Sequence, residues 1–239
     1  MKIIRAFEHQ KTKIKNLLFK SLHLHKIKSI VWDIDGTMYN NLDLGKKIYS
    51  EYILFIAGKK KIKNLKTAGM MLEQHTARGM TWSQAAAQLT GIREIDILKR
   101  VGRNIDRSKF LKTDESLISM FSSKKIQHYA HFILTNSTKR NAIQTLNALG
   151  LTENIVRFER IICVEDFKYV KPHPSCFEMV LNITRTPAET HLMVGDDMVA
   201  DIIPARKIGM KTCLMNSNYS IFDGDLLFAD IKQLYGFLR

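Results

Sequence analysis

The chain has 239 residues and a formal net charge of +14, and 45% of its residues are hydrophobic. This is the composition of an ordinary globular protein with a sizeable buried core. It excludes a membrane-spanning protein, because no apolar run is long enough to cross a bilayer. The basic N-terminus lacks the apolar core and cleavage site of a signal peptide, so we expect a cytoplasmic protein.

The charge is unevenly distributed along the chain. Residues 40–112 carry fifteen Lys and Arg against six Asp and Glu, whereas residues 113–239 carry equal numbers of each. Basic segments suit anionic partners, although a solvated basic surface explains them equally well. The three cysteines have no framework spacing, and we expect free thiols in a reducing cytosol.

Residues 1–27 predict a short amphipathic basic arm. Apolar residues recur at helical spacing between basic ones, at Ile14, Leu17, Leu18 and Leu22. One interpretation is a helix that packs on the domain. The other is a segment that makes weak contact with an anionic surface, either lipid or nucleic acid.

The stretch VWDIDGTMYN, residues 31–40, follows the arm and carries the first chemical signal. An apolar strand ending at Trp32 runs into Asp33 and Asp35. Side chains alternate along a strand, so both carboxylates point to the same side. Two such acids are tolerated when a divalent cation lies between them, and an acidic loop exit is the alternative.

Residues 40–112 predict an all-helical insert. Leu44, Ile48 and Tyr52 keep helical spacing, and nothing in the segment alternates with period two. Thr81 is placed to cap a helix that Gly91 ends. A further helical period follows at Ile92, Ile95, Leu98 and Val101.

The C-terminal half alternates strand and helix signals. We expect strands at 130–134, 160–164, 191–195 and 211–215. A helix is expected at 141–149, with Ile143, Leu146 and Leu149 facing inward. Further helices are expected from Pro174 onward, after a cap formed by Thr186 with Pro187, and at 201–208. Short apolar strands between helices predict a parallel sheet that is covered on both faces.

Polar residues follow three of these strands. Thr135 and Asn136 stand where a strand passes into a helix, which suits a phosphate, although helix capping explains them too. Lys171 precedes a proline turn and could neutralise phosphate charge. Asp196 and Asp197 follow Gly195 and suit Mg²⁺, with helix capping by Asp197 as the alternative.

Together these stretches resemble the haloacid dehalogenase superfamily. Its phosphatases carry DxDGT, a strand ending in Thr or Ser, a Lys that is often followed by Pro, and GDD with a later Asp. This chain has the same series in order, at 33–37, Thr135, Lys171-Pro172 and 195–197 with Asp201. The resemblance covers about residues 28–215.

The resemblance implies an α/β fold. Its core is a Rossmann-like, three-layer α/β/α parallel sheet formed by residues 28–39 and 113–239, and residues 40–112 form an inserted helical cap of the C1 type.

The resemblance also implies a chemistry. Asp33 is the nucleophile that becomes an aspartyl-phosphate, and Asp35 is the acid and base. Mg²⁺ is bound at Asp33, at Asp35 through its backbone carbonyl, and by the pair Asp196 and Asp197. Thr135, Asn136 and Lys171 hold the phosphate. Dehalogenases lack a carboxylate at the position of Asp35, so its presence favours phosphoryl transfer.

Three functions remain open on this basis. The first is a phosphatase for a small phosphomonoester, the second a phosphatase for a nucleotide or nucleic-acid end, and the third a non-catalytic anion-binding protein. Hydrolysis is favoured over mutase transfer. The eight histidines suggest no zinc site, and those at 128 and 131 are expected at the surface or as caps. The oligomeric state cannot be predicted.

Overall fold

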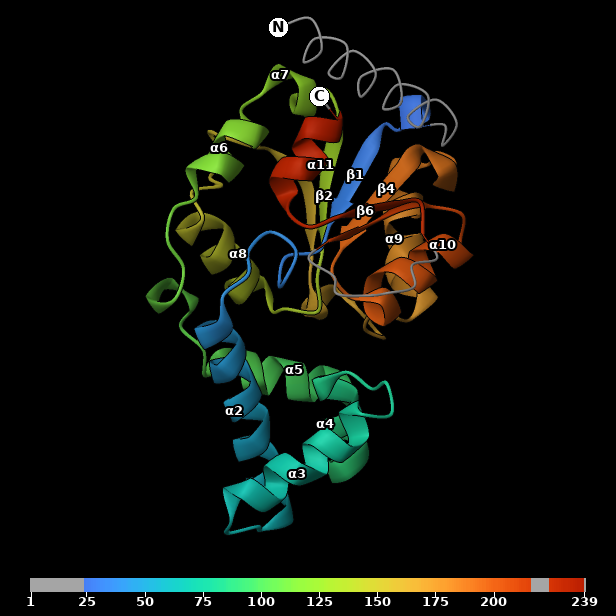
Figure 1. Cartoon of the computed structure of the whole chain (residues 1–239). Coiled ribbons are helices and arrows are strands. Elements are labelled where there is room, and N and C mark those ends of the chain that lie inside the picture. The colour runs from blue at the N-terminus through green and yellow to red at the C-terminus, as the bar shows by residue number, and fades with distance from the viewer. Residues whose placement is uncertain (1–23, 216–223, 239) are drawn as a thin grey trace, which may run out of the picture.

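The computed structural model describes residues 24–215 and 224–238. Six parallel strands form one sheet in the order β3-β2-β1-β4-β5-β6 (Figure 1). Their bounds are β1 Ser29–Trp32, β2 Ala130–Leu134, β3 Phe158–Ile162, β4 His191–Gly195, β5 Lys211–Met215 and β6 Leu226–Phe228. The predicted parallel sheet is therefore confirmed, and residues 1–23 of the predicted arm at 1–27 lie outside the described residues.

β1 is a central strand because both of its faces are apolar. Ile30 and Trp32 join the hydrophobic cluster on one side of the sheet, and Val31 joins the cluster on the other. The strand pairs with β2 and β4, and Trp32 stands beside Ile133 and Val194 in register. These three strands consequently end at one level of the sheet.

Helices cover both faces of the sheet, which gives the expected three layers (Figure 1). One face is covered by α6 Glu115–Phe121, α7 Lys124–Gln127, α8 Lys139–Ala148 and α11 Ile231–Leu238. The other is covered by α9 Pro174–Thr184 and α10 Ile203–Lys207. Short turns of helix lie between them, at η1 Leu24–Lys26, η3 Val164–Asp166, η4 Ala188–Thr190 and η5 Met198–Ile202.

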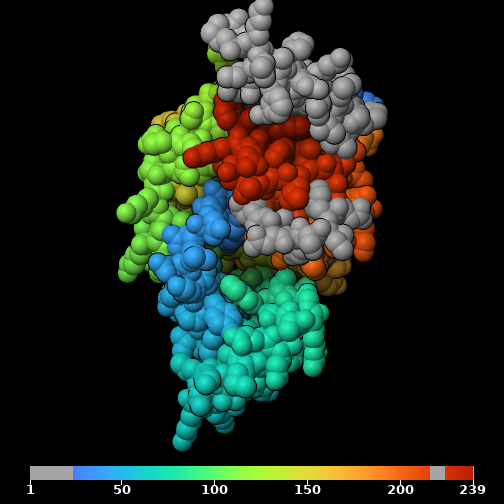
Figure 2. All heavy atoms as spheres, in the orientation of Figure 1, coloured from blue at the N-terminus to red at the C-terminus, as the bar shows by residue number. Residues whose placement is uncertain are grey.

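Four helices between β1 and α6 form the insert, α2 Leu42–Lys60, α3 Leu65–Thr76, α4 Trp82–Thr90 and α5 Glu94–Arg103. They enclose a hydrophobic cluster that includes Leu44, Ile56 and Ile97. Thr81 caps α4 in a capping box with Gln84, and Gly91 ends it at φ 69°, as predicted. Figure 2 shows the insert as a lobe that meets the core along one side. The limits 40 and 112 stay a prediction.

The segment leading out of the insert is fastened to the core. It contains η2 Arg107–Lys109, and the backbone N–H of Arg107 donates to Oε1 of Gln144 at 3.1 Å. Gln144 in turn donates to Asp106 at 2.5 Å. Asn141 also donates to the carbonyl of Gly102 at 3.0 Å. Helix α8 therefore anchors the end of the insert.

Several local predictions were wrong in their details. Ile143 is 40% exposed, and Ala142 packs inward instead. Thr186 caps no α-helix, because only the turn η4 follows Pro187. The helix predicted at 201–208 is divided into the π-helix η5 and the short α10. The third strand spans 158–162 instead of 160–164, and β6 and α11 were not predicted.

His131 also differs from the prediction, since it is buried in β2 instead of lying at the surface. Its Nδ1 accepts from Trp32 Nε1 at 3.1 Å, and its Nε2 lies 3.0 Å from the carbonyl oxygen of Ile126. The ring thus satisfies the indole N–H of Trp32 inside the core. All three cysteines are free and buried, as predicted. None of the helices in the described ranges has the length and apolarity to cross a membrane.

Candidate active site

The candidate site lies at the carboxyl ends of the central strands. The backbone N–H of Asp33 donates to Val194 in β4 at 2.9 Å, so the chain just beyond β1 still follows the sheet. Thr135 follows β2 in the same way, through a 3.0 Å bond to Ile162. Open α/β sheets place ligands at this edge.

Three carboxylates meet there, from Asp33, Asp196 and Asp201. Each offers an oxygen within 4.8 Å of the other two. The Lys171 ammonium bonds to Asp33 Oδ1 at 2.7 Å and to Asp201 Oδ1 at 2.6 Å. We call these four residues the Asp33 cluster. Three carboxylates against one ammonium leave it with an excess of negative charge when all are ionised.

The pKa values of these residues reflect the excess of negative charge. Burial, together with the charges of Asp201 and Asp35, raises the pKa of Asp33 despite Lys171. Burial and the charges of Asp33 and Asp201 raise the pKa of Asp196 as well. The pKa of Lys171 is raised, because Asp201 and Asp33 outweigh the effect of its burial. The single positive charge of Lys171 therefore does not balance the three carboxylates.

Two glycines make room for this cluster. Gly36 has φ 85°, a conformation that other residues rarely adopt, and a Cβ there would overlap the carboxylate of Asp196. A Cβ on Gly195 would overlap the side chain of Asp201. Both positions therefore need glycine so that the acidic side chains can approach the backbone.

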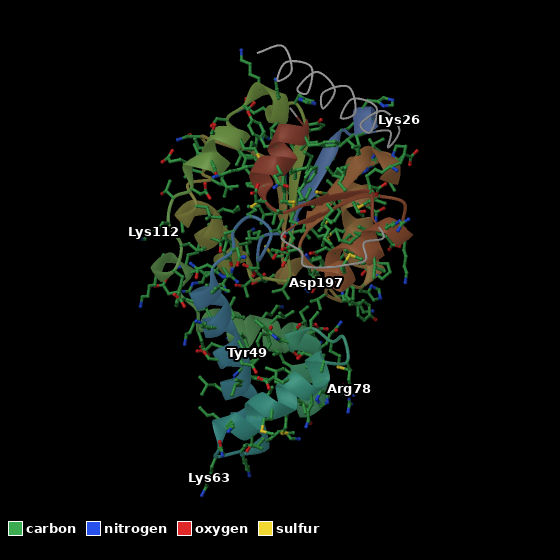
Figure 3. All side chains as sticks on the ribbon, in the orientation of Figure 1. Lys26, Tyr49, Lys63, Arg78, Lys112 and Asp197 are labelled. Carbon is green, nitrogen blue, oxygen red and sulfur yellow. The ribbon has the colours of Figure 1, made fainter. Side chains whose placement is uncertain are left out.

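Asp197 stands apart from the other acids. Its Oδ1 accepts from the backbone N–H groups of Val199 and Ala200, at 2.7 and 2.9 Å, so it caps η5. Asp201, which the sequence analysis did not assign to the metal, points back into the cluster from η5. Figure 3 places Asp197 at the edge of the core that faces the insert. Its role as a metal ligand stays a prediction.

The two polar residues after β2 are both engaged. Asn136 clamps the backbone of Lys171, since its Nδ2 donates to the carbonyl at 2.9 Å and its Oδ1 accepts from the N–H at 3.0 Å. Thr135 is buried, and its Oγ1 accepts from the backbone N–H of Ser137 at 3.1 Å. Asn136 therefore positions Lys171.

Asp35 lies in a second group of side chains, which we call the Asp35 cluster. Arg107 holds its carboxylate with both terminal nitrogens, one of them at 3.0 Å from Oδ2. Tyr39 and Ser137 donate to it at 2.5 Å each. Arg107 also donates to Ser137 at 2.9 Å, which closes the group. No sequence motif pointed to Arg107 or Tyr39.

The Asp35 cluster is balanced in charge. Burial by itself raises the pKa of Asp35, but the Arg107 guanidinium and the hydrogen bonds from Arg107, Ser137 and Tyr39 outweigh it and lower the pKa to about 2. Asp35 is therefore held as an anion beside its own cation, in contrast to Asp33.

Both clusters open into one pocket of about 480 Å³ between the core and the insert. The side facing the insert is largely apolar and aromatic, with Ile48, Tyr52, Met80, Trp82, Leu98 and Val101. Among the described residues that line the pocket, Lys171 and Arg107 are the only Lys or Arg side chains. Both are already bonded to carboxylates.

A divalent metal fits the Asp33 cluster. Hard carboxylate oxygens are the ligands that Mg²⁺ prefers, and burial together with the neighbouring carboxylates raises the pKa values of Asp33 and Asp196, so a further cation would stabilise their ionised forms. Asp33 and Asp196 are free of bonds to Arg, whereas Asp35 is not. A metal at the Asp33 cluster would therefore leave the Asp35 side chain to its own partners.

Comparison with known proteins points to one family. The sequence profile of the haloacid dehalogenase-like hydrolases matches residues 30–215. The chain is also similar to curated relatives named pyrophosphatase PpaX. That of Halalkalibacterium halodurans is 24% identical over 222 residues, which cover 87% of this chain and 95% of the relative. That of Bacillus thuringiensis is 23% identical over 193 residues, which cover 80% and 84%.

Solved structures agree on the fold. A HAD phosphatase from Thermococcus onnurineus is similar with a TM-score of 0.60 and 19% identity, over 89% of this chain and 98% of that one. A 2-haloacid dehalogenase from Pseudomonas syringae is similar with a TM-score of 0.54 and 18% identity, over 89% and 98%. The fold is thus shared by different chemistries. On the match of its sequence to the family profile, the chain belongs to the haloacid dehalogenase-like hydrolase family.

Proposed function

We propose that this hydrolase is a Mg²⁺-dependent phosphatase that cleaves a small phosphomonoester through a phosphorylated Asp33. The observation that supports it best is the pair of carboxylates with opposite surroundings in one pocket. Asp33 lies in a cluster whose three carboxylates outnumber the single Lys171 ammonium, and Asp35 lies outside that cluster with Arg107 as its own cation. The nucleophile and the proton carrier are thus two carboxylates in separate surroundings, and a metal beside Asp33 would hold it as the anion that attacks.

The metal would be held by Asp33 and Asp196, with Asp201 supporting the cluster through Lys171. Its positive charge would reduce the repulsion between an anionic nucleophile and an anionic phosphate. The family resemblance expects Asp197 as a further ligand, but in this proposal it caps η5 instead, and the Asp35 carbonyl is the remaining ligand.

The first step transfers the phosphoryl group to the protein. An Asp33 carboxylate oxygen forms a bond to phosphorus as the bond from phosphorus to the ester oxygen breaks. Lys171, Thr135 and Asn136 would bind the other phosphate oxygens. Asn136 would also keep Lys171 in place. The departing oxygen takes a proton from Asp35 in its acid form.

The second step releases phosphate. Asp35 accepts a proton from water, whose oxygen bonds to phosphorus while the bond to Asp33 breaks. Arg107 holds Asp35 as the anion, the form that this step needs. Donation in the first step needs the less available protonated form. Aryl esters, whose leaving oxygen requires little protonation, are therefore expected to react fastest.

The shape of the pocket favours an uncharged leaving group with an apolar or aromatic part. Trp82 is 37% exposed and packs against Tyr49 and Tyr52, with ring centroids 5.4 and 6.2 Å away. A neighbouring hollow of about 600 Å³ also borders Trp82 and Asp35, so the leaving group has room beyond the site.

Pyrophosphate, which the names of the curated relatives suggest, is the second candidate. Its leaving group is a second phosphate and would need a free cation. In the described pocket lining, both Lys and Arg side chains are engaged with carboxylates. We therefore place pyrophosphate behind aryl and nucleoside phosphomonoesters.

The test is a substrate panel with and without Mg²⁺. Release of phosphate from an aryl phosphate should require Mg²⁺ and should be faster than release from pyrophosphate or from a short alkyl phosphate. A non-catalytic anion-binding protein would release none. Faster turnover of pyrophosphate would reverse the order of the two candidates. A cytoplasmic location stays a prediction.

A further inference from the structure

Helix α5 has two faces with different roles. Leu98 and Gly102 line the active-site pocket, and Val101 borders both that pocket and a hollow on the other side of the helix. Lys99, Arg100 and Arg103 line a separate hollow on another side of the helix, together with residues of α2. The helix is therefore the wall between the candidate active site and a second concave surface.

This second surface is a groove between α2 and α5. It consists of two adjoining hollows of about 370 and about 640 Å³, which share Phe55, Lys59, Arg100 and Asn104. Four cationic side chains line it, from Lys59, Lys99, Arg100 and Arg103. We call it the α2–α5 groove. The candidate catalytic residues do not border it.

Within residues 24–215 and 224–238, the positive charge of the groove is not neutralised by carboxylates. None of its four cations forms an ion pair with a carboxylate of the described chain, whereas its two acids are both engaged. Asp96 is bound by Arg93 at 2.8 Å. Glu51 accepts from Lys47 at 2.6 Å and from Asn104 at 2.9 Å. The positive charge is thus free to act on a ligand.

The floor of the groove is apolar and aromatic. Leu54 is 48% exposed, and the half-buried ring of Phe55 lies 5.7 Å from the guanidinium carbon of Arg100. The cations continue beyond the groove, because Arg140 of α8 donates to the carbonyl of Arg103 at 3.4 Å. This makes a cationic track in which the Arg100 guanidinium lies over the Phe55 ring.

We propose that the α2–α5 groove binds a single-stranded nucleic acid. Such ligands bind where cations follow the backbone and aromatic side chains receive the bases. A concave surface also favours a strand over a lipid bilayer, since a flat membrane would reach only the rim. The binding does not depend on the phosphatase chemistry proposed above, so either can fail without the other.

The experiment measures binding of end-labelled DNA and RNA oligonucleotides of about 12 nucleotides to the full chain by fluorescence anisotropy. The groove variant replaces Lys59, Lys99, Arg100 and Arg103 by Gln. Its affinity should fall by at least about tenfold at low salt. The slope of log affinity against log salt should become shallower by roughly 3, which corresponds to four lost phosphate contacts on a single strand.

Two control variants carry the same change of charge elsewhere. One replaces exposed cations of the core by Gln, at Lys124, Lys125, Arg157 and Lys207. The other replaces Lys11, Lys13, Lys15 and Lys20 of the arm. Both should bind more tightly than the groove variant. Circular dichroism and the thermal midpoint establish that each variant is folded, and Phe55→Leu tests the groove without any change of charge.

We expect the groove variant to lose more oligonucleotide affinity than either control variant. A duplex of equal length should bind more weakly than the single strand, and Phe55→Leu should bind the single strand more weakly than the wild type does. Equal loss in the groove and core variants would overturn the proposal and indicate a general effect of charge. Loss confined to the arm variant would place binding on the arm. Tighter binding to anionic lipid vesicles than to the oligonucleotides would identify the surface as a membrane contact.

Discussion

Asp33 and Asp35 are two residues apart, and their surroundings have opposite electrostatic character. The Asp33 cluster holds three carboxylates around one ammonium, and its acids have raised pKa values. The Asp35 cluster pairs one carboxylate with one guanidinium, and its acid has a lowered pKa. One DxD motif thus supplies one acid that shares a single cation with other carboxylates and one that has a cation of its own.

The two clusters also differ in where their residues come from. The Asp33 cluster is assembled by the sheet and the loops that follow its strands, so it belongs to the core alone. The Asp35 cluster depends on Arg107, which the segment after the insert brings back against α8. The position of the insert and the state of Asp35 are therefore connected through one side chain.

The largest expected effect is that of Asp33→Asn. If Asp33 is the nucleophile, turnover of an aryl phosphate should fall by about 10³-fold or more, because an amide cannot form the phosphorylated intermediate. Initial rates at saturating Mg²⁺ measure this, with circular dichroism for the fold. Asp43→Asn, at an exposed position of α2, is the matched control. A rate near that of the wild type would remove Asp33 from the mechanism.

The next largest effect distinguishes Asp196 and Asp201, which belong to the Asp33 cluster, from the neighbouring Asp197. Asp196→Asn and Asp201→Asn should each raise the Mg²⁺ concentration needed for activity by roughly 10–100-fold. Asp197→Ala should leave it nearly unchanged and instead lower the free energy of unfolding by about 1 kcal/mol, since it caps η5. Mg²⁺ titrations and urea unfolding test this. A rise confined to Asp197→Ala would restore Asp197 as the ligand.

Arg107→Gln tests the Asp35 cluster. The shorter neutral side chain loses both bonds to Asp35, and we expect activity to fall by about tenfold because the carboxylate is no longer held in place. Lys109→Gln is the control two residues away, at an exposed cation. Equal activity of both variants would show that Asp35 is positioned without Arg107.

The same variant should change acid unfolding. The pKa of Asp35 is lowered in the folded protein, so the unfolded chain binds the proton first as the pH falls. The pair therefore contributes stability above about pH 4 that is lost towards pH 2, about 1 kcal/mol after solvent screening. Urea unfolding at several pH values should show this loss in the wild type and not in Arg107→Gln. An unchanged pH dependence in the variant would contradict it.

The smallest effect has the opposite sign and belongs to the Asp33 cluster. Its raised pKa values mean that the folded protein keeps protons that the unfolded chain releases above about pH 4, so stability without metal falls as the pH rises. Mg²⁺ should displace these protons, and its gain in thermal midpoint should grow from about pH 5 to about pH 8. A gain that Asp196→Asn retains in full would place the metal elsewhere.

Much of the core could be predicted because its signals are local. Apolar strands between helices predict a parallel sheet, and the carboxyl ends of neighbouring strands must meet at one edge. Asp33, Thr135, Lys171 and Asp196 consequently line one pocket. The helix between Thr81 and Gly91 could be predicted equally well, because each cap involves residues only a few positions apart.

Other features needed contacts between distant segments. That Asp201 joins the Asp33 cluster while Asp197 caps η5 depends on the direction of the chain through η5, where a π-helix replaces the predicted α-helix. Ile143 has the right spacing to face inward, but the orientation of α8 on the sheet buries Ala142 instead.

The sequence by itself determined the family, the order of the strand-end motifs and the helical nature of the insert, because each depends on residues that are neighbours along the chain. Only the tertiary structure decided which cation faces which acid. Arg107 lies 72 residues from Asp35, in a segment with no motif, and reaches it because α8 holds that segment in place. Charges interact through space, so two side chains that pair can lie far apart in the sequence, and no local sequence pattern predicts the pair.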